Sequence, residues 1–280
     1  MKWNDEAGAA LDKMPFSVRR KVKSRAEASA LRAGKEIVDL TDIEPDSAGD
    51  ANVQKHESTG YRFEVCSGTG ICPNRAHRHC NGDSQGLATR IVEILEQANL
   101  KDFLEQHVKG PIRSHHAFGV SLSDCPNACS RPQIKDIGIT GAASPALTDI
   151  ACVMCGACEN ACRECAISLD PCKETPVIDQ ERCISCGSCI AVCPTGKIGV
   201  DTSGYRVMIG GKLGRHARLA DRIPGIFDDE TVLFIIRWCV AMYKEKSIRG
   251  KRFAEIVAEE GDALISELIQ DIQKNYQKNQ

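Results

Sequence analysis

Two stretches decide the organisation of this chain: residues 151–165 read ACVMCGACENACREC, and residues 181–197 read ERCISCGSCIAVCPTGK. Each contains a run of four cysteines separated by two, two and three residues. With two residues between ligands, consecutive thiolates can wrap one face of an iron–sulfur cluster, whereas the fourth lies too far round the turn and ligates the other cluster. The spacing therefore predicts two [4Fe-4S] clusters. The first set of ligands is Cys152, Cys155, Cys158 and Cys193, and the second set is Cys183, Cys186, Cys189 and Cys162.

Zinc is the alternative for this block, because zinc also binds paired C-x2-C motifs. Two successive runs with the same spacing favour iron–sulfur clusters instead. Over residues 145–200 the chain resembles the bacterial two-cluster ferredoxins. The first run departs from that pattern, since Arg163 follows Cys162 where ferredoxins usually have proline, and nearby Cys165 could compete as a ligand. The second run keeps its Pro194.

Composition narrows the class of protein further. The chain has 280 residues, 16 cysteines and a formal net charge of -2, so we expect no general attraction to nucleic acid. No apolar run is long enough to span a bilayer, and the first residues lack the apolar core of a signal peptide. We therefore expect a cytoplasmic location, where disulfides are rare and cysteines need another role such as metal binding. An aromatic content of 5% favours several small cores over one large core.

Four earlier cysteines have a different spacing. Their contexts are VCSGTGICPNRAH at residues 65–77 and SLSDCPNACSRPQIKDIGITG at residues 121–141. The C-x5-C motif, followed by C-x3-C within a CPN-x-C-x-RP stretch, resembles the iron–sulfur and sirohaem half of the nitrite/sulfite reductase family. The resemblance implies a third [4Fe-4S] cluster, with Cys129 also bridging to sirohaem iron. Its ligands would be Cys66, Cys72, Cys125 and Cys129.

The resemblance continues beyond the dense cysteine block. Residues 205–225, YRVMIGGKLGRHARLADRIPG, look like the glycine-rich segment with which that family approaches sirohaem, and the stretch through Arg252-Phe253 also matches. Dissimilatory sulfite reductases likewise carry a ferredoxin module inserted in this domain. The resemblance implies that sirohaem lies along Gly210, Gly211, Lys212, Gly214 and Arg215.

An oxyanion substrate such as sulfite or nitrite, and the carboxylates of sirohaem, would need nearby cations. For each basic residue a solvated surface position is the alternative. The candidates for the catalytic site are Arg131, Lys135, Lys212 and Arg215, with Arg75, Arg78, Arg113 and Arg218 as further cations and His77, His79, His115, His116 and His216 as proton donors.

The N-terminal segment differs from the rest. Apolar residues at helical spacing predict one helix that ends near Pro15, and a second over about 16–33 that Gly34 closes. The second helix is basic, and it is either a solvated face or a docking surface for an acidic partner subunit. Residues 1–43 resemble the small C-terminal domain of a light-independent protochlorophyllide reductase subunit. The polar residues 44–58 are typical of a linker.

Taken together, these patterns predict an α+β chain with a small N-terminal helical domain. We expect an α/β nitrite/sulfite-reductase-like domain that contains an inserted two-cluster ferredoxin-like domain. Helical spacing predicts helices over 87–108 and from 228 onward. The predicted segments are a helical domain at 1–43, a linker at 44–58, the iron–sulfur/sirohaem domain at 59–142 and 201–266, its insertion at 145–200, and a tail at 267–280, of which we expect residues 271–280 to be frayed.

Three functions remain open at this point. The first is a sirohaem oxidoreductase that reduces sulfite or nitrite and receives electrons from a donor protein or reductase subunit. The second is an electron-transfer protein with three [4Fe-4S] clusters and no sirohaem, which the lack of a preceding ferredoxin-like half-domain favours. The third is a tetrapyrrole-binding or maturation protein. The cysteines without a required role are Cys80, Cys165, Cys172 and Cys239, the last of which we expect in a helical core.

Overall fold

The computed structural model forms two compact units, Met1–Ala51 and Asn52–Gln280. Each is considered by itself below. Cys72, Cys80 and most of the predicted basic helix lie outside the described residues. The structure describes residues 2–12, 19, 23, 26, 27, 30, 35, 37–39, 53–57, 60–67, 69, 76 and 83–278.

The N-terminal unit contains strands as well as helix. Strand β1 (Lys2–Trp3) pairs in parallel with β2 (Ile37–Val38), and helix α1 (Asp5–Asp12) follows β1. The expectation of a wholly helical domain was therefore wrong for β1 and β2. The unit has a small core of its own, made of Ala7, Ala26, Ala30 and Val38.

The second unit is built on a six-stranded mixed sheet with the order β10-β9-β6-β5-β4-β3. Strands β4, β5 and β6 run parallel to one another, whereas β3, β9 and β10 pair antiparallel with their neighbours. Residues 53–57 form the edge strand β3, so the predicted linker is wrong there. The strands are β3 (Val53–Glu57), β4 (Tyr61–Cys66), β5 (Phe118–Ser123), β6 (Ile137–Leu147), β9 (Ile198–Ile209) and β10 (Asp221–Arg222).

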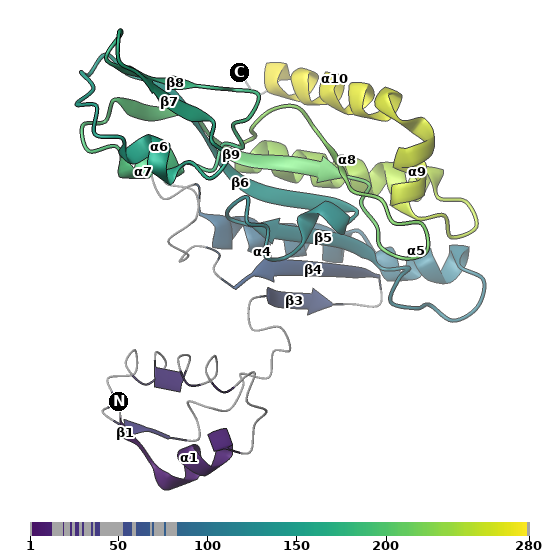
Figure 1. Cartoon of the computed structure of the whole chain (residues 1–280). Coiled ribbons are helices and arrows are strands. Elements are labelled where there is room, and N and C mark those ends of the chain that lie inside the picture. Colours follow the sequence, from purple (N-terminus) through teal and green to yellow (C-terminus); the bar gives the residue numbers. More distant parts are fainter. Residues whose placement is uncertain are drawn as a thin grey trace. The chain divides into compact units, whose positions relative to one another are not determined.

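Helices α4 and α8 lie side by side along one face of this sheet (Figure 1). The helix predicted over 87–108 is in fact two, because Asn99 adopts a left-handed conformation with φ of 48° that ends the first helical run. The Asp83 carboxylate caps α4 by accepting from Gly86 N at 2.9 Å. The helices of the second unit are α4 (Ser84–Gln97), α5 (Leu100–His107), α6 (Ala157–Ala161), α7 (Ser188–Val192), α8 (Asp229–Lys246), α9 (Phe253–Glu260) and α10 (Asp262–Lys278), with the 3-10 helix η1 (Pro132–Ile134).

The C-terminal segment is part of the core. Helix α10 continues to Lys278, and its side chains Leu268 and Ile272 are 0% and 5% exposed. The indole of Trp238 on α8 donates to Asp271 Oδ2 at 3.1 Å, which fixes α10 against α8. The prediction that residues 271–280 are frayed was therefore wrong as far as Lys278. Within the residues that the structure describes, no helix is long and apolar enough to cross a membrane.

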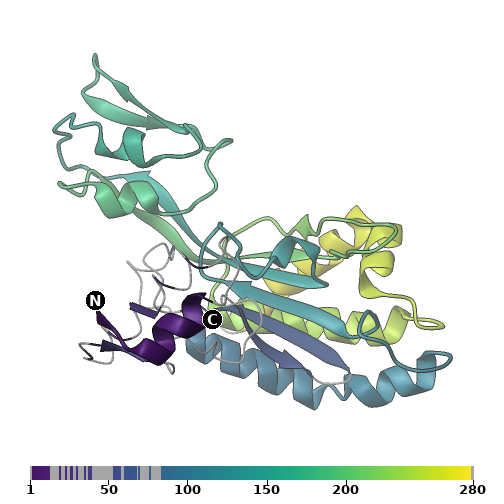
Figure 2. The ribbon, with the colours of Figure 1, turned by 60° about the horizontal axis from the view of Figure 1, so that its bottom comes forward.

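The dense cysteine block leaves the sheet on a long β-ribbon. Strands β6 and β9 pair from Ile137↔Ile209 to Leu147↔Ile198, and the register shifts at Ser144/Pro145. Beyond the ribbon, the chain forms a small module of α6, α7 and the hairpin of β7 (Ile167–Asp170) and β8 (Thr175–Ile178) (Figures 1 and 2). The module has its own core of Cys158, Ile167, Cys189 and Ile198. The register shift coincides with the predicted start of the insertion at residue 145.

Candidate metal centres

The two cysteine runs follow the same backbone course. Met154 and Ser185, at equivalent positions, have φ of 53° and 54°. Gly156 and Gly187, two residues later, have φ of 73° and 72° and precede α6 and α7. Positive φ is rare outside glycine, so the paired occurrence indicates that both loops have the same tight turn. The structure therefore contains an internal repeat, as the spacing predicts.

The first predicted set of cysteines lines one pocket. Cys152, Cys155, Cys158 and Cys193 all border it. Burial raises the pKa of the Cys158 thiol, and negative charge on Cys152 and Cys193 raises it further, which reflects their proximity. Backbone N–H groups point at two of these sulfurs, since Met154 N lies 3.3 Å from Cys152 Sγ and Ile198 N lies 3.4 Å from Cys193 Sγ. The shared pocket and these donors suit a group that binds as several thiolates.

The second set has the same character. Burial raises the pKa of Cys189 to about 12, with further contributions from Cys186 and Cys183. Ser185 N donates to Cys183 Sγ at 3.4 Å, and Ala166 N donates to Cys162 Sγ at 3.3 Å. Cys162 packs against the module core that contains Cys189.

The described residues include no group of three or more His, Cys, Asp or Glu side chains close enough to hold a single metal ion. A cubane cluster is a larger body whose thiolate ligands stand at four separate corners. Among the cysteines without a predicted role, Cys165 and Cys172 are exposed. Cys239 is fully buried in α8, which confirms the expectation that it belongs to the core.

Cys66 and Cys125 lie at the same edge of the sheet, where two neighbouring parallel strands end. Cys66 ends β4, Cys125 lies just beyond the end of β5, and these parallel strands are neighbours. Carboxyl ends of adjacent parallel strands are a common place for ligands in open sheets. Ala76, the described residue between Cys72 and Cys80, reaches the same edge, because Ala76 N donates to Asp124 O at 2.9 Å.

A buried serine fixes the loop that carries Cys129. Ser130 Oγ donates to Leu122 O at 2.8 Å and lies 2.7 Å and 2.6 Å from the hydroxyls of Ser121 and Ser123. These bonds fold the loop back along β5. The Asn127 amide then donates to Cys129 Sγ at 3.1 Å, which fixes the position of the sulfur. These serines were not identified in the sequence analysis. The signal that could have revealed them is that Ser121 and Ser123 lie two residues apart on β5 and therefore face the same side of the sheet.

The second cysteine run contacts this edge directly. One pocket of about 490 Å³ is lined by Cys125 and Asn127 from the sheet domain and by Cys186 and Ser188 from the module. Ala143 N on β6 donates to Ser185 O at 2.8 Å. The loop before α7 is thus held against the sheet edge that carries Cys125.

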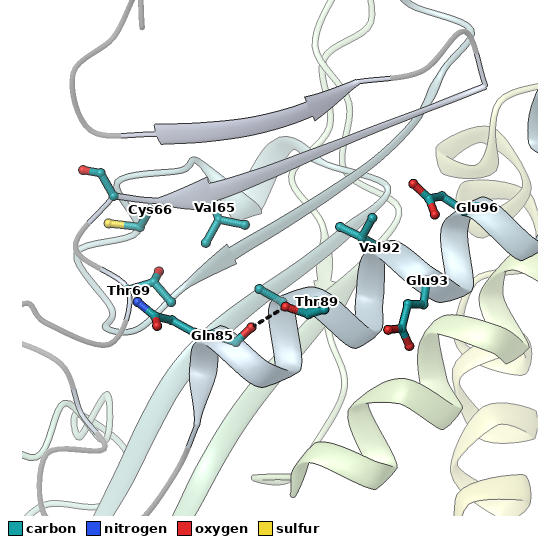
Figure 3. A pocket seen from close by; sticks show the side chains of 10 residues that line it. Val65, Cys66, Thr69, Gln85, Thr89, Val92, Glu93 and Glu96 are labelled. Carbon is teal, nitrogen blue, oxygen red and sulfur yellow. Dashed lines mark hydrogen bonds between the residues drawn. The ribbon is translucent and has the colours of Figure 1, made fainter. Parts of the chain in front are cut away.

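A second pocket lies next to Cys66, and no sequence pattern predicted it. It has a volume of about 510 Å³ and lies between the end of β4 and the polar side of α4. Figure 3 shows Cys66 and Thr69 facing Gln85 across it, with Glu93 and Glu96 farther along the helix. The Cys66 end of β4 therefore borders open space.

The glycine-rich segment after β9 lies against the chain that follows Cys129. A Cβ on Gly211 would lie 2.6 Å from Gln133 O, and one on Gly210 would lie 2.6 Å from Val257 Cγ1. Close packing within the domain thus accounts for both glycines. Gly214, with φ of 119°, has nothing within 4 Å of its added Cβ, so open space lies beside it. Of the three glycines, Gly214 is the one whose surroundings leave room for a bound group.

The predicted cations differ in their surroundings. Lys135 forms an ion pair with Glu64 at 2.6 Å in which both side chains are largely buried. Lys212 pairs with Glu255 at 2.9 Å. Arg131 and Arg215 are exposed. The two lysines are therefore partly neutralised, whereas the two arginines reach solvent.

The further cations and histidines are only partly described. Arg75, Arg78, His77 and His79 lie outside the described residues. The rings of His115 and His116 lie 4.1 Å apart, and burial, with His115 and two arginines, lowers the pKa of His116. His216 is exposed, and Arg218 is ion-paired with Asp221.

Comparison with known proteins agrees with these features. Residues 3–45 match the family described as proto-chlorophyllide reductase 57 kD subunit. The coenzyme F420-dependent sulfite reductase of Methanocaldococcus jannaschii is 31% identical over 247 residues, which cover 87% of this chain and 37% of that protein. One subunit of the anaerobic sulfite reductase of Salmonella typhimurium is 30% identical over 122 residues, 44% of this chain and 30% of that protein. The chain thus spans about a third of the length of the curated relatives it matches.

Two solved structures overlap with the fold. Dissimilatory sulfite reductase I has a TM-score of 0.48 and 15% identity, over 76% of this chain and 53% of that one. The NirA protein of Mycobacterium tuberculosis has a TM-score of 0.39 and 20% identity, over 70% of this chain and 25% of that one. The family described as nitrite and sulphite reductase 4Fe-4S domain matches residues 64–278, which contain most of the sheet, both cysteine runs and the helices that follow. This chain is a homologue of sulfite reductases and belongs to the nitrite and sulphite reductase 4Fe-4S domain family.

Proposed function

We propose that this chain carries the sirohaem-linked centre of a sulfite- or nitrite-reducing oxidoreductase and supplies it with electrons through two ferredoxin-type [4Fe-4S] clusters. The observation that carries the proposal is the pocket shared by Cys125 and Cys186. These cysteines belong to the two kinds of motif, and they border the same space. A reductase that stores and passes on electrons needs such closeness between its redox centres.

In this proposal a third [4Fe-4S] cluster binds at the edge where β4 and β5 end. Cys129 would hold both this cluster and sirohaem, and sirohaem, when bound, would supply the iron at which the oxyanion is reduced. The chain's own contribution is to hold the Cys129 thiolate in place, through the Asn127 amide and the Ser130 hydroxyl. The ligands of the third cluster are Cys66, Cys72, Cys125 and Cys129.

The surroundings of the cations divide their proposed roles. Exposed Arg131 and Arg215 are the better candidates to bind the substrate anion or the carboxylates of sirohaem. Lys135 and Lys212, with their carboxylate partners, hold the loop after Cys129 and the glycine-rich segment in position. Gly214 leaves room beside that segment for the macrocycle.

Electrons would enter at the first set of cysteines and leave through the second. Cys155 is exposed and Val153 beside it is 60% exposed, so the first cluster is accessible to an electron-donor protein. Cys186 faces the sheet edge. The relatives are longer than this chain, and we propose that the system is completed by a donor protein or by a further reductase subunit. The basic N-terminal segment is a candidate docking surface for such a subunit.

The visible spectrum of anaerobically purified protein tests the proposal. Sirohaem gives sharp bands, whereas iron–sulfur clusters alone give broad absorbance. Three cubanes predict about twelve iron and about twelve acid-labile sulfide atoms per chain. The alternative, an electron-transfer protein without sirohaem, is favoured by Gly210 and Gly211, since internal packing accounts for them. If fully reconstituted protein showed only the broad absorbance, the result would support this alternative and refute the proposal that the chain carries a sirohaem-linked centre for substrate reduction.

A further inference from the structure

Arg206 links the sheet to the second cysteine run. It lies on β9 opposite Thr140 of β6, within the ribbon that carries the module. Its guanidinium donates from Nη1 to Ile184 O at 2.5 Å and from Nη2 to Ser185 Oγ at 2.7 Å. Ile184 and Ser185 are the two residues between Cys183 and Cys186. One side chain therefore holds both residues of the loop that joins these cysteines.

The held loop is in a conformation that needs support. Ser185 has φ of 54°, in the left-handed region that non-glycine residues rarely adopt. In this conformation Ser185 N points at Cys183 Sγ, at 3.4 Å. Arginine suits this task because its rigid planar fork holds two acceptors in a fixed geometry, whereas the donors of a lysine ammonium rotate on a flexible stem.

Arg206 also places a positive charge beside the loop. Burial lowers the pKa of Arg206, and repulsion from Arg222 lowers it further, whereas attraction to Cys183 opposes both effects. The equivalent loop of the first run is different, because Val153, the counterpart of Ile184, is 60% exposed. The two repeats thus share a backbone course but differ in their surroundings.

We propose that Arg206 is a positioning residue for the second ferredoxin-type cluster, which both holds the Cys183–Cys186 loop and raises the reduction potential of that cluster. The inference rests on the proposed function. When one electron passes from the reduced first cluster to the oxidised second cluster, the second gains one negative charge. A nearby cation stabilises that charge, so the electron is directed toward the edge that carries Cys125. The electron-donor protein supplies the electron that re-reduces the first cluster.

The test compares Arg206→Gln, Arg206→Lys and Arg222→Gln in the reconstituted full chain, by EPR-monitored redox titration. Arg222 lines the same pocket as Arg206 and Cys183, so its variant removes a neighbouring charge and leaves the fork intact. We expect Arg206→Gln to shift the electron distribution between the two clusters about tenfold toward the first, about 59 mV for a one-electron couple. In Arg206→Gln, only the reduction potential of the second ferredoxin-type cluster should change, and those of the other centres should equal the wild-type values. Arg206→Lys should recover part of the shift, and Arg222→Gln should change little.

Several results would overturn the inference. The first is that Arg206→Gln has the same reduction potentials as the wild type. The second is that Arg206→Gln shifts the potentials of both ferredoxin-type clusters equally. The third is that Arg222→Gln shifts the potential of the second ferredoxin-type cluster more than Arg206→Gln does. If Arg206→Gln retains fewer clusters, Arg206→Lys decides: wild-type iron content with any change confined to the potential of the second ferredoxin-type cluster supports the role, and equal shifts of both ferredoxin-type clusters refute it. Iron and sulfide counts on the wild type separate the two proposals. A wild-type chain that binds no ferredoxin-type clusters would refute the proposed function itself.

Discussion

Replacing Ser130 by alanine should loosen the loop that carries Cys129. The change removes three contacts of one hydroxyl, but two partners keep other bonds: Ser121 Oγ still donates to Ser130 O at 2.9 Å, and Ser123 Oγ still accepts from Ser130 N at 3.2 Å. Leu122 O loses a donor, and the Ser123 hydroxyl loses an acceptor, because Ser130 Oγ gives its one hydrogen to Leu122 O and accepts from Ser123. We therefore expect a loss of about 1–2 kcal/mol in the free energy of unfolding, at the lower end of the range for orphaned buried groups.

For a unit of this size, that loss corresponds to a fall in Tm of roughly 2–8 °C. Anaerobic thermal unfolding followed by circular dichroism measures it, and the exposed Ser114→Ala is the matched control. Because Ser130 is not itself a ligand but holds Cys129 in place, iron should also be lost from the variant at lower denaturant concentration. A Ser130→Ala protein with the Tm and iron retention of Ser114→Ala would refute the reasoning.

Three further predictions concern the core, pH and the bridging thiolate. Leu268→Ala should lower the free energy of unfolding by about 2–5 kcal/mol, since Leu268 is fully buried, and unchanged denaturant unfolding would contradict the packing of α10 into the core. The pKa of Asp136 is raised by burial to about 6 from 3.8, so the folded state binds this proton more tightly and stability from this group rises as pH falls from 6 toward 4. Asp136→Asn should flatten that rise in unfolding midpoints measured across this range, and an unchanged profile would contradict the assignment. Cys129→Ser should abolish magnetic coupling between cluster and sirohaem, and EPR that still shows wild-type coupling would exclude Cys129 as the bridge.

Sequence patterns predicted those features of the fold that depend on residues close together in the chain. The repeated x2, x2, x3 spacing is matched by a repeated backbone course, with φ of 53° at Met154 and 54° at Ser185. Helical spacing predicted α8 and the burial of Cys239. It could not predict the break at Asn99, because a single left-handed residue leaves the apolar periodicity on either side almost unchanged.

Features that depend on distant partners were missed. Residues 53–57 are polar and look like a linker, yet they pair with β4 because an edge strand needs only backbone bonds on one side. Lys135 was expected to bind the substrate anion or a carboxylate of sirohaem. Its ammonium group instead pairs with Glu64, which is far away in the sequence but lies on a strand of the same sheet. The spacing of charges along a sequence does not reveal which of them meet in the fold.

The way in which the module is inserted has a consequence for electron transfer. An insertion through two flexible linkers would let the clusters drift relative to the sheet. Here the connections are the strands β6 and β9, whose ladder is continuous from Ile137↔Ile209 to the register shift at Ser144/Pro145. The loop between Cys183 and Cys186 is bonded to both strands, to β6 through Ala143 and to β9 through Arg206. Because both strands also cross the sheet that ends at Cys125, the same backbone would fix the proposed electron donor and acceptor, and their separation would be set by β-ladder geometry rather than by side-chain packing alone.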